Sequence, residues 1–245
     1  MIQAEGLRKH FASVEAVRAV DLEARDGEIT GLLGPNGAGK STTLRIISSV
    51  IGADAGRVLV DGLDVATDPR RARLAMGVMP HNAGLYPRLS GRENIRYFGE
   101  LNDMRQPALD TRIDAVVERL DMGEFVDRPA KGYSQGQRLK TALARAMIHG
   151  PRNLILDEPT SGLDVMATRA LRELIRDLRR DGYCILFSSH VMQEVAALCD
   201  RIVIIAHGQV VARGKPEELL AELGTDNLEE AFVRAIERGQ EAIAS

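Results

Sequence analysis

A glycine-rich segment, GPNGAGKS from Gly34 to Ser41, has the spacing of a loop that binds phosphate. Its glycines allow the backbone to curl so that successive N–H groups point at phosphate oxygens. Lys40 would then reach the β- and γ-phosphates of a nucleoside triphosphate, and the Ser41 hydroxyl would ligate Mg²⁺. The residues of this phosphate loop that we expect to contact a nucleotide are Gly34, Asn36, Gly37, Ala38, Gly39, Lys40, Ser41 and Thr42.

A second segment, NLILDEP, is typical of a buried strand and ends in two carboxylates, Asp157 and Glu158. Sheets of α/β proteins bind ligands at the C-terminal ends of their parallel strands. We expect Asp157 to hold Mg²⁺, directly or through water, and Glu158 to polarise the attacking water. Two acidic residues after a strand carry little information alone, but the phosphate loop upstream makes the pair specific.

His190 directly follows a third strand-like run, YCILFSS. A single histidine is more often structural than catalytic, but this one shares its strand-end position with Gly34 and Asp157. A donor to the γ-phosphate would stabilise the charge of the transition state, so we expect His190 to act in catalysis with Lys40 and Glu158.

The apolar pattern predicts the elements that must position these groups. Residues 1 to about 80 alternate strand-like runs with turns and one helix, which should run from Gly39 to about Val50. The predicted strands of this part are 2–11, 15–24, 28–34 and 56–62. Over 90–150 the apolar spacing becomes helical, with segments in 90–104, 108–120 and 136–149, which indicates a helical insertion between strands.

After Pro151 strands and helices alternate again, which indicates a parallel sheet with helices on its faces. The expected order is a strand at 153–159, a helix at 165–180, a strand at 183–190, a helix near 191–198 and a strand at 200–208. From Lys215 onward, KPEELLAELG and NLEEAFVRAIERG read as two short amphipathic helices that pack on the core.

Composition excludes some classes of protein. The 245 residues carry a net charge of −3 and a pI near 6.0, which argues against a dedicated nucleic-acid binder. Cys184 and Cys199 lack metal or redox spacing, so we interpret them as reduced thiols or as small buried apolar residues. No run approaches the roughly 18 apolar residues of a membrane span, and no secretory leader is evident. A role at a membrane would therefore need a partner.

Five segments occur in the order typical of one family: GPNGAGKS, YSQGQ, LILDEP, SGLD and His190. The chain resembles the ATP-binding subunit of ABC transporters over essentially its whole length. The resemblance implies an α/β fold of the P-loop NTPase type, with a parallel-sheet core, an antiparallel β edge subdomain and an inserted helical subdomain. It implies ATP and Mg²⁺ as cofactors and ATP hydrolysis coupled to transport. The implied single domain, 1–245, divides into a core of about 1–80 and 151–214, a helical subdomain of about 85–150 and a helical tail of about 215–245.

The resemblance also explains a second glycine-bearing helix start, the signature loop YSQGQ (Tyr133–Gln137). In the family two subunits meet head to tail, and each ATP lies between the phosphate loop of one and the signature loop of the other. Ser134, Gly136 and Gln137 would thus grip a nucleotide held by a second subunit, expected to be an identical copy. Asp164, in the D-loop Ser161–Asp164, would lie at the same nucleotide.

Phe11 falls where the family places an aromatic residue against the adenine ring, with Val17 flanking the base. The alternative for Phe11 is a core residue of its strand. Two departures from the family pattern matter. Tyr133 and Gln135 replace the usual Leu and first Gly of the signature loop, and His81 stands where the family has a glutamine. An imidazole there would still reach Mg²⁺ or the attacking water, with a charge that depends on its surroundings.

The loop segments look most like the sodium-efflux branch of exporter-type subunits, so we expect a separate integral membrane permease and a position at the cytoplasmic face of the membrane. The turn with Tyr86, Pro87 and Arg88 should contact that permease; ordinary solvent-exposed residues are the alternative. The rival classes are a non-transport ABC ATPase acting on nucleic acid or the ribosome and a lone P-loop switch or kinase. The first lacks support in the charge, and the second leaves the signature loop without a role.

Overall fold

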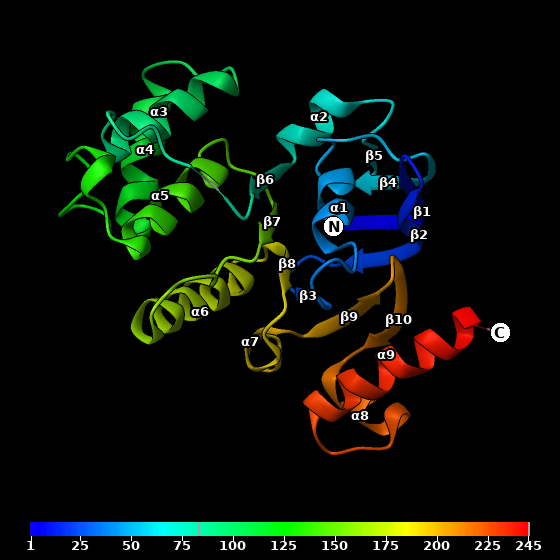
Figure 1. The fold of residues 1–245 in the computed structure, drawn as a ribbon. Coiled ribbons are helices and arrows are strands. Elements are labelled where there is room, and N and C mark those ends of the chain that lie inside the picture. Colours follow the sequence, from blue (N-terminus) through cyan, green and yellow to red (C-terminus); the bar gives the residue numbers. More distant parts are fainter. Residues whose placement is uncertain (83, 245) are drawn as a thin grey trace.

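The centre of the molecule is a six-stranded sheet in the order β10-β9-β3-β8-β7-β6 (Figure 1). The computed structural model describes residues 1–82 and 84–244. The strands are β3 (Ile29–Leu33), β6 (Met76–Met79), β7 (Asn153–Asp157), β8 (Cys184–Ser189), β9 (Arg201–Ala206) and β10 (Gln209–Gly214). All neighbours pair in parallel except β10, which runs antiparallel to β9. The C-terminal ends of β3, β6, β7 and β8 therefore lie at one edge.

A second sheet is antiparallel and has the order β2-β1-β4-β5. Its strands are β1 (Ile2–Phe11), β2 (Val14–Ala24), β4 (Ala55–Val60) and β5 (Leu63–Asp64). Helix α1 (Lys40–Ile47) lies between the two sheets, and its residues Leu44 and Ile47 belong to a buried cluster that both sheets share (Figure 1).

Residues of the central strands alternate between the two faces of the sheet, as strand geometry requires. On β7, Leu154 and Leu156 pack in one buried cluster and Ile155 packs in the other. Both faces are covered, so β3, β7, β8 and β9 are largely apolar and were recognisable from the sequence.

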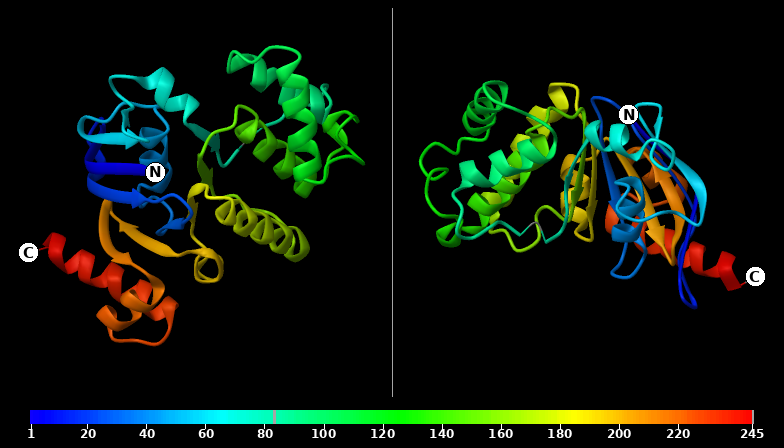
Figure 2. Two further views of the ribbon diagram at one scale, coloured as in Figure 1. Left: turned by 180° about the vertical axis from the view of Figure 1, so that it is seen from behind. Right: turned by 90° about the horizontal axis from the view of Figure 1, so that it is seen from above.

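The helices α3 (Gly91–Leu101), α4 (Ala108–Arg119) and α5 (Gln135–Met147) form a group to one side of the sheets (Figures 1 and 2). Helix α3 begins with a reciprocal capping box, in which the Ser90 hydroxyl accepts from the Glu93 amide and the Glu93 carboxylate accepts from the Ser90 amide. The group shares a buried cluster with the face of the central sheet that also carries α6 (Val165–Arg180) and α7 (Met192–Leu198).

The two C-terminal helices, α8 (Pro216–Leu223) and α9 (Leu228–Ala244), pack on the core, as the sequence predicted. The expectation that both are short was wrong for α9, which has 17 residues. Its first half is anchored by the buried Ala231 and Ala235. The helix continues to Ala244, beyond Gly239, where the predicted segment NLEEAFVRAIERG ends.

Four further elements differ from the prediction. The first 80 residues contain a second helix, α2 (Pro69–Leu74), which Asp68 caps by accepting from the Arg71 amide. The strands β6 and β10 were not predicted because each is short and lacks a clear period. Helix α1 ends at Ile47 rather than near Val50.

Both cysteines are free and buried, and burial raises the pKa of the Cys184 thiol to about 12. The interpretation as buried reduced thiols is confirmed. Within 1–82 and 84–244, no helix is both long and apolar enough to traverse a bilayer.

Candidate active site

The phosphate loop joins β3 to α1 and requires glycine at two left-handed positions. Gly37 has φ 79° and Gly39, the N-cap of α1, has φ 102°. A Cβ on Gly39 would lie 2.6 Å from the Ala16 carbonyl oxygen, so no larger residue fits. No side chain among the described residues caps this helix start. The first N–H groups of α1 therefore remain available for an anion.

Lys40 begins α1 and is only 5% exposed. Its ammonium donates to the carbonyls of Gly34 at 2.7 Å and Pro35 at 3.1 Å. Burial lowers the pKa of Lys40, and the negative charges of Glu158 and Asp157 oppose that shift. The ammonium is thus held at the mouth of the loop by two neutral acceptors, which a phosphate oxygen can replace.

Asp157, at the end of β7, lies between two hydroxyls. Ser188 Oγ donates to its Oδ1 at 2.6 Å, and Ser41 Oγ lies 3.3 Å from the same oxygen. A hydroxyl and a carboxylate that converge in this way are the hard oxygen ligands that Mg²⁺ prefers. Ser188 also accepts the Glu158 amide at 3.0 Å. We had not singled out Ser188, although the pair SS before His190 was visible.

Glu158 is the centre of a small charged group. Its Oε2 lies 3.2 Å from His190 Nδ1 and 3.7 Å from His81 Nδ1, and its Oε1 lies 3.7 Å from Lys40 Nζ. Its backbone is left-handed, with φ 49°. Such a conformation in a non-glycine residue costs about 1–3 kcal/mol and occurs mainly where the surroundings impose it. The structure thus brings all four residues expected in catalysis together.

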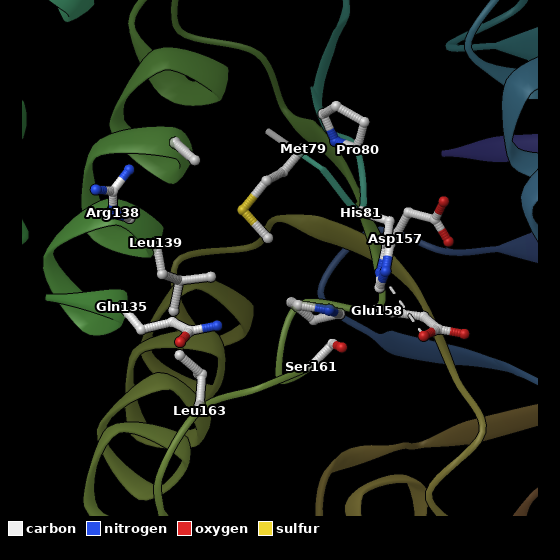
Figure 3. Close-up of a pocket in the computed structure, with 12 residues that line it drawn as sticks. Met79, Pro80, His81, Gln135, Arg138, Leu139, Asp157, Glu158, Ser161 and Leu163 are labelled. Carbon is white, nitrogen blue, oxygen red and sulfur yellow. Dashed lines mark ion pairs between the residues drawn. The ribbon is translucent and has the colours of Figure 1, made fainter. Parts of the chain in front are cut away.

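The cleft beside these groups has a volume of about 730 Å³, within the range of small-molecule sites. Its lining includes Asn36, Ser41, His81, Asp157, Glu158, Ser161 and His190. A smaller cavity of about 150 Å³ adjoins it, and Figure 3 shows Gln135, Arg138 and Leu139 of α5 facing His81 and Glu158 across that cavity. Helix α5 is therefore near the carboxylates, but its N-terminus does not line the larger cleft.

The signature loop is folded differently from the phosphate loop. The Ser134 hydroxyl accepts from the Gln137 amide at 3.2 Å, and Gln137 Oε1 accepts from the Ser134 amide at 3.0 Å. Ser134 is exposed, and Gly136 and Gln137 are half-buried. The three residues lie together at the start of α5, turned to the outside of the cleft.

The two departures in the signature loop have structural effects. Tyr133 is buried, accepts the Gly91 amide at 2.9 Å and lies 2.8 Å from the Phe125 carbonyl oxygen, to which it donates. It therefore anchors the helical group. Gln135 lies against the D-loop, because a Cβ on Gly162 would be 2.5 Å from Gln135 Nε2.

Three further expected residues do not line the cleft of about 730 Å³. Phe11, at the end of β1, is 47% exposed, so it is not a core residue of its strand; Lys9 Nζ lies 5.7 Å from its ring centroid. Val17 is fully buried in the core, and its side chain offers no surface to a base. Asp164 caps α6 by accepting from the Ala167 amide at 2.8 Å.

Several known proteins are similar to this chain in sequence or in structure. A family model described as ABC transporter matches residues 17–161. The ABC transporter ATP-binding protein NatA of Bacillus subtilis (strain 168) is 40% identical over 227 residues, which cover 92% of each chain. The Nod factor export ATP-binding protein I of Ralstonia nicotianae is 36% identical over 230 residues, 94% of this chain and 72% of that protein.

Among solved structures, the dimeric structure of MJ0796, a bacterial ABC transporter cassette, matches with a TM-score of 0.79 at 25% identity. The match covers 88% of this chain and 98% of that one. The resemblance expected from the five motifs and the P-loop NTPase fold class are both confirmed. On the strength of the family match and of the relatives, this chain belongs to the ATP-binding proteins of the ABC transporter family.

Proposed function

We propose that this chain is the ATP-hydrolysing subunit of an exporter, which drives a separate membrane permease through ATP-dependent dimerisation. The observation that carries the proposal is the convergence of Lys40, Ser41, Asp157, Glu158 and His190 at one edge of the sheet, beside a cleft of about 730 Å³. In this proposal about 1–80 and 151–214 form the catalytic core, about 85–150 the helical subdomain and 215–245 the tail.

The phosphate loop supplies the binding half of the reaction. Free N–H groups at the start of α1 receive the phosphates, and Lys40 exchanges its carbonyl partners for phosphate oxygens. Ser41 and Asp157 would hold Mg²⁺, which would neutralise negative charge on the phosphates. Phe11, exposed at the end of β1, stacks on the adenine.

Glu158 supplies the chemical half. Its carboxylate accepts a hydrogen bond from the attacking water and orients it, a role worth about 10²–10⁴ in rate. His190, 3.2 Å away, donates to the γ-phosphate and stabilises the charge that develops there. His81, at 3.7 Å from the same carboxylate, lies where it contacts the water or the metal.

The exposed start of α5 completes the site from a second subunit. Ser134, Gly136 and Gln137 lie outside the cleft of their own chain, so they serve a nucleotide held by another copy. The dimeric state named for the MJ0796 cassette supports this arrangement. Because the γ-phosphate would bridge the two copies, ATP binding stabilises the dimer and hydrolysis releases it.

A permease contact is supported by an aromatic patch on the helical group. Tyr86 and Tyr97 are 46% and 40% exposed, and their rings meet edge to face at 5.2 Å. Beside them a groove of about 290 Å³ runs between α3, α5 and β6. Tyr86, Pro87 and Arg88 are exposed and are our candidates for the contact.

Such a contact places the chain at the cytoplasmic face of the membrane. The relative named for Nod factor export supports outward transport. Sodium or a small solute or drug is the cargo that the resemblance to the sodium-efflux branch implies.

The decisive experiment uses Glu158→Gln, which keeps the shape of the side chain and removes the base. We expect ATP to bind, turnover to fall by about 10²–10⁴, and a dimer to elute from size exclusion with Mg-ATP but not with Mg-ADP. A variant that binds ATP yet stays monomeric at high concentration would refute the shared site. Co-purification with a polytopic membrane protein supports the transport role; co-purification with nucleic acid or ribosomes favours the rival class.

A further inference from the structure

A buried carboxylate beside the active site has no part in the mechanism described so far. Glu194 lies in the first turn of α7 and is only 6% exposed. Its Oε2 accepts from Thr160 Oγ1 at 2.5 Å and from Ser189 Oγ at 2.9 Å. Burying a carboxylate is costly unless hydrogen bonds compensate for the lost water, so Glu194 depends on these two donors.

The two donors come from the segments that carry the groups expected in catalysis. Thr160 lies two residues after Glu158, at the start of the turn that leads into the D-loop. Ser189 lies directly before His190, and its Oγ also accepts the Val191 amide at 3.0 Å. Hydrogen bonds within this network therefore fix the backbone on both sides of His190.

A single strand-to-strand contact would not define the distance between Glu158 and His190. Ser188 joins the ends of β7 and β8 by contacting both Asp157 and the Glu158 amide. Beyond that point the β7–β8 ladder ends, because Ser189, the last residue of β8, pairs only with Leu33 of β3 on the other side. Glu194 adds a second link. It joins Thr160, which follows Glu158, to Ser189, which precedes His190.

The conformation of Glu158 makes this link consequential. Its left-handed φ of 49° has to be imposed from outside, and the turn that follows it is closed by the Ser161 amide donating to the Glu158 carbonyl at 3.1 Å. The Thr160 hydroxyl anchors that turn to α7. Without the anchor, the turn and the carboxylate before it could shift relative to His190.

We propose that Glu194 is a positioning residue for ATP hydrolysis: through Thr160 and Ser189 it holds Glu158 and His190 at their working separation. The inference rests on the proposed function of those two residues. Glu194 itself does not line the cleft of about 730 Å³ and acts only through its two partners. The competing explanation is that the network merely stabilises the fold.

The test compares Thr160→Val, which removes the hydroxyl at nearly constant shape, with Thr160→Ser, which keeps it. We expect Thr160→Val to lower kcat by about ten- to a hundredfold, since small displacements of reacting groups have effects of that size. KM for Mg-ATP should stay within about twofold, and Thr160→Ser should restore kcat to within about threefold of the wild type. Ser189→Ala removes the other donor and provides a second variant with the same expected pattern.

Thr30→Val is the matched control, because Thr30 is a buried threonine of β3 whose hydroxyl has no partner among the described residues. It should leave kcat and KM unchanged. If kcat of Thr160→Val and of Ser189→Ala stays within about twofold of the wild type, or if Thr160→Ser loses as much activity as Thr160→Val, the inference is overturned. Glu158→Gln, assayed in parallel, separates the two claims: a wild type without ATPase activity, or an active Glu158→Gln, overturns the proposed function and this inference with it.

Discussion

Two helices of this protein begin at glycine-bearing loops, and they treat their free N–H groups in opposite ways. Helix α1 starts at Gly39, with left-handed backbone and no side-chain cap from the described residues. Helix α5 starts at Ser134, whose hydroxyl and whose partner Gln137 close a reciprocal capping box. The first helix start is buried at the cleft, whereas the second is exposed on the outside.

The difference teaches what each loop is able to do alone. The start of α1 leaves its donors unsatisfied and adds a buried ammonium, so it is suited to bind phosphate without a second subunit. The start of α5 has already satisfied one of its donors internally, and its neighbouring cation, Arg138, is exposed. It therefore suits a second, weaker layer of contacts that form only when another subunit presents its nucleotide.

The largest effect is expected when the phosphate loop loses its buried charge, the ammonium of Lys40. Lys40→Met should lower ATP turnover by about 10²–10³, as loss of one preorganised donor to a transition state does. The unfolding temperature should not fall, because burial already disfavours the ammonium, as the lowered pKa of Lys40 indicates. A steady-state ATPase assay and thermal unfolding measure the two properties; a less stable variant that still turns over ATP would contradict the assignment.

The next effect sets one glycine against the other. Gly39→Ala would have to adopt φ 102° with its Cβ 2.6 Å from a carbonyl oxygen, so stability should fall by about 1–3 kcal/mol and ATP binding should be lost. The Cβ of Gly136→Ala meets only Ala167 at 3.7 Å. That variant should keep or gain up to about 1 kcal/mol and bind ATP, but dimerise poorly. Denaturant unfolding and size exclusion distinguish them; equal behaviour would remove the contrast.

A smaller effect isolates the cap of α5. Ser134→Ala should cost about 1 kcal/mol of stability and abolish ATP-dependent dimerisation of Glu158→Gln, while ATP binding by the monomer persists. Ser90→Ala is the matched control, because it breaks an equivalent capping box on α3. It should cost the same stability and leave dimerisation intact. Loss of the dimer in both variants would show that stability, not a phosphate contact, is responsible.

The smallest effect concerns His81, which lies 3.7 Å from Glu158. His81→Gln removes the imidazole and keeps a polar side chain, the one that the family has at this position. We expect kcat to change by no more than about fivefold, because charges about 4 Å apart in water interact by about 1 kcal/mol. A steady-state ATPase assay measures kcat, and an unchanged value would leave His81 without a catalytic part.

Most of the fold was predictable because most of its elements are determined by patterns among neighbouring residues. The central strands β3, β7, β8 and β9 are continuous apolar runs, and α6 was predicted with the bounds that it has. Apart from the length of α9, the failures concern short elements. Asp68 and Pro69 formed a cap signal for α2 that we did not use, while β6 and β10 have four and six residues and no decisive period.

The residues of the site could be predicted where they belong to a local sequence pattern. The glycines of the phosphate loop and the carboxylates after β7 are recognisable from spacing alone. Ser188, Thr160 and Glu194 were not, because a serine, threonine or glutamate has no distinctive spacing. Ser188 lies 31 residues from its partner Asp157 and 30 residues from its partner Glu158 in the chain. Thr160 lies 34 residues from Glu194.

The sequence by itself thus determined which segments are strands and helices, and that one loop is built for phosphate, because glycine and apolar period act on neighbouring residues. Only the tertiary structure decided that β3 lies between β8 and β9, which brings Lys40, Glu158 and His190 together. It also decided that Val17 is buried while Phe11 and Ser134 are exposed. Strand order and burial depend on how distant surfaces pack, and no local pattern encodes that choice.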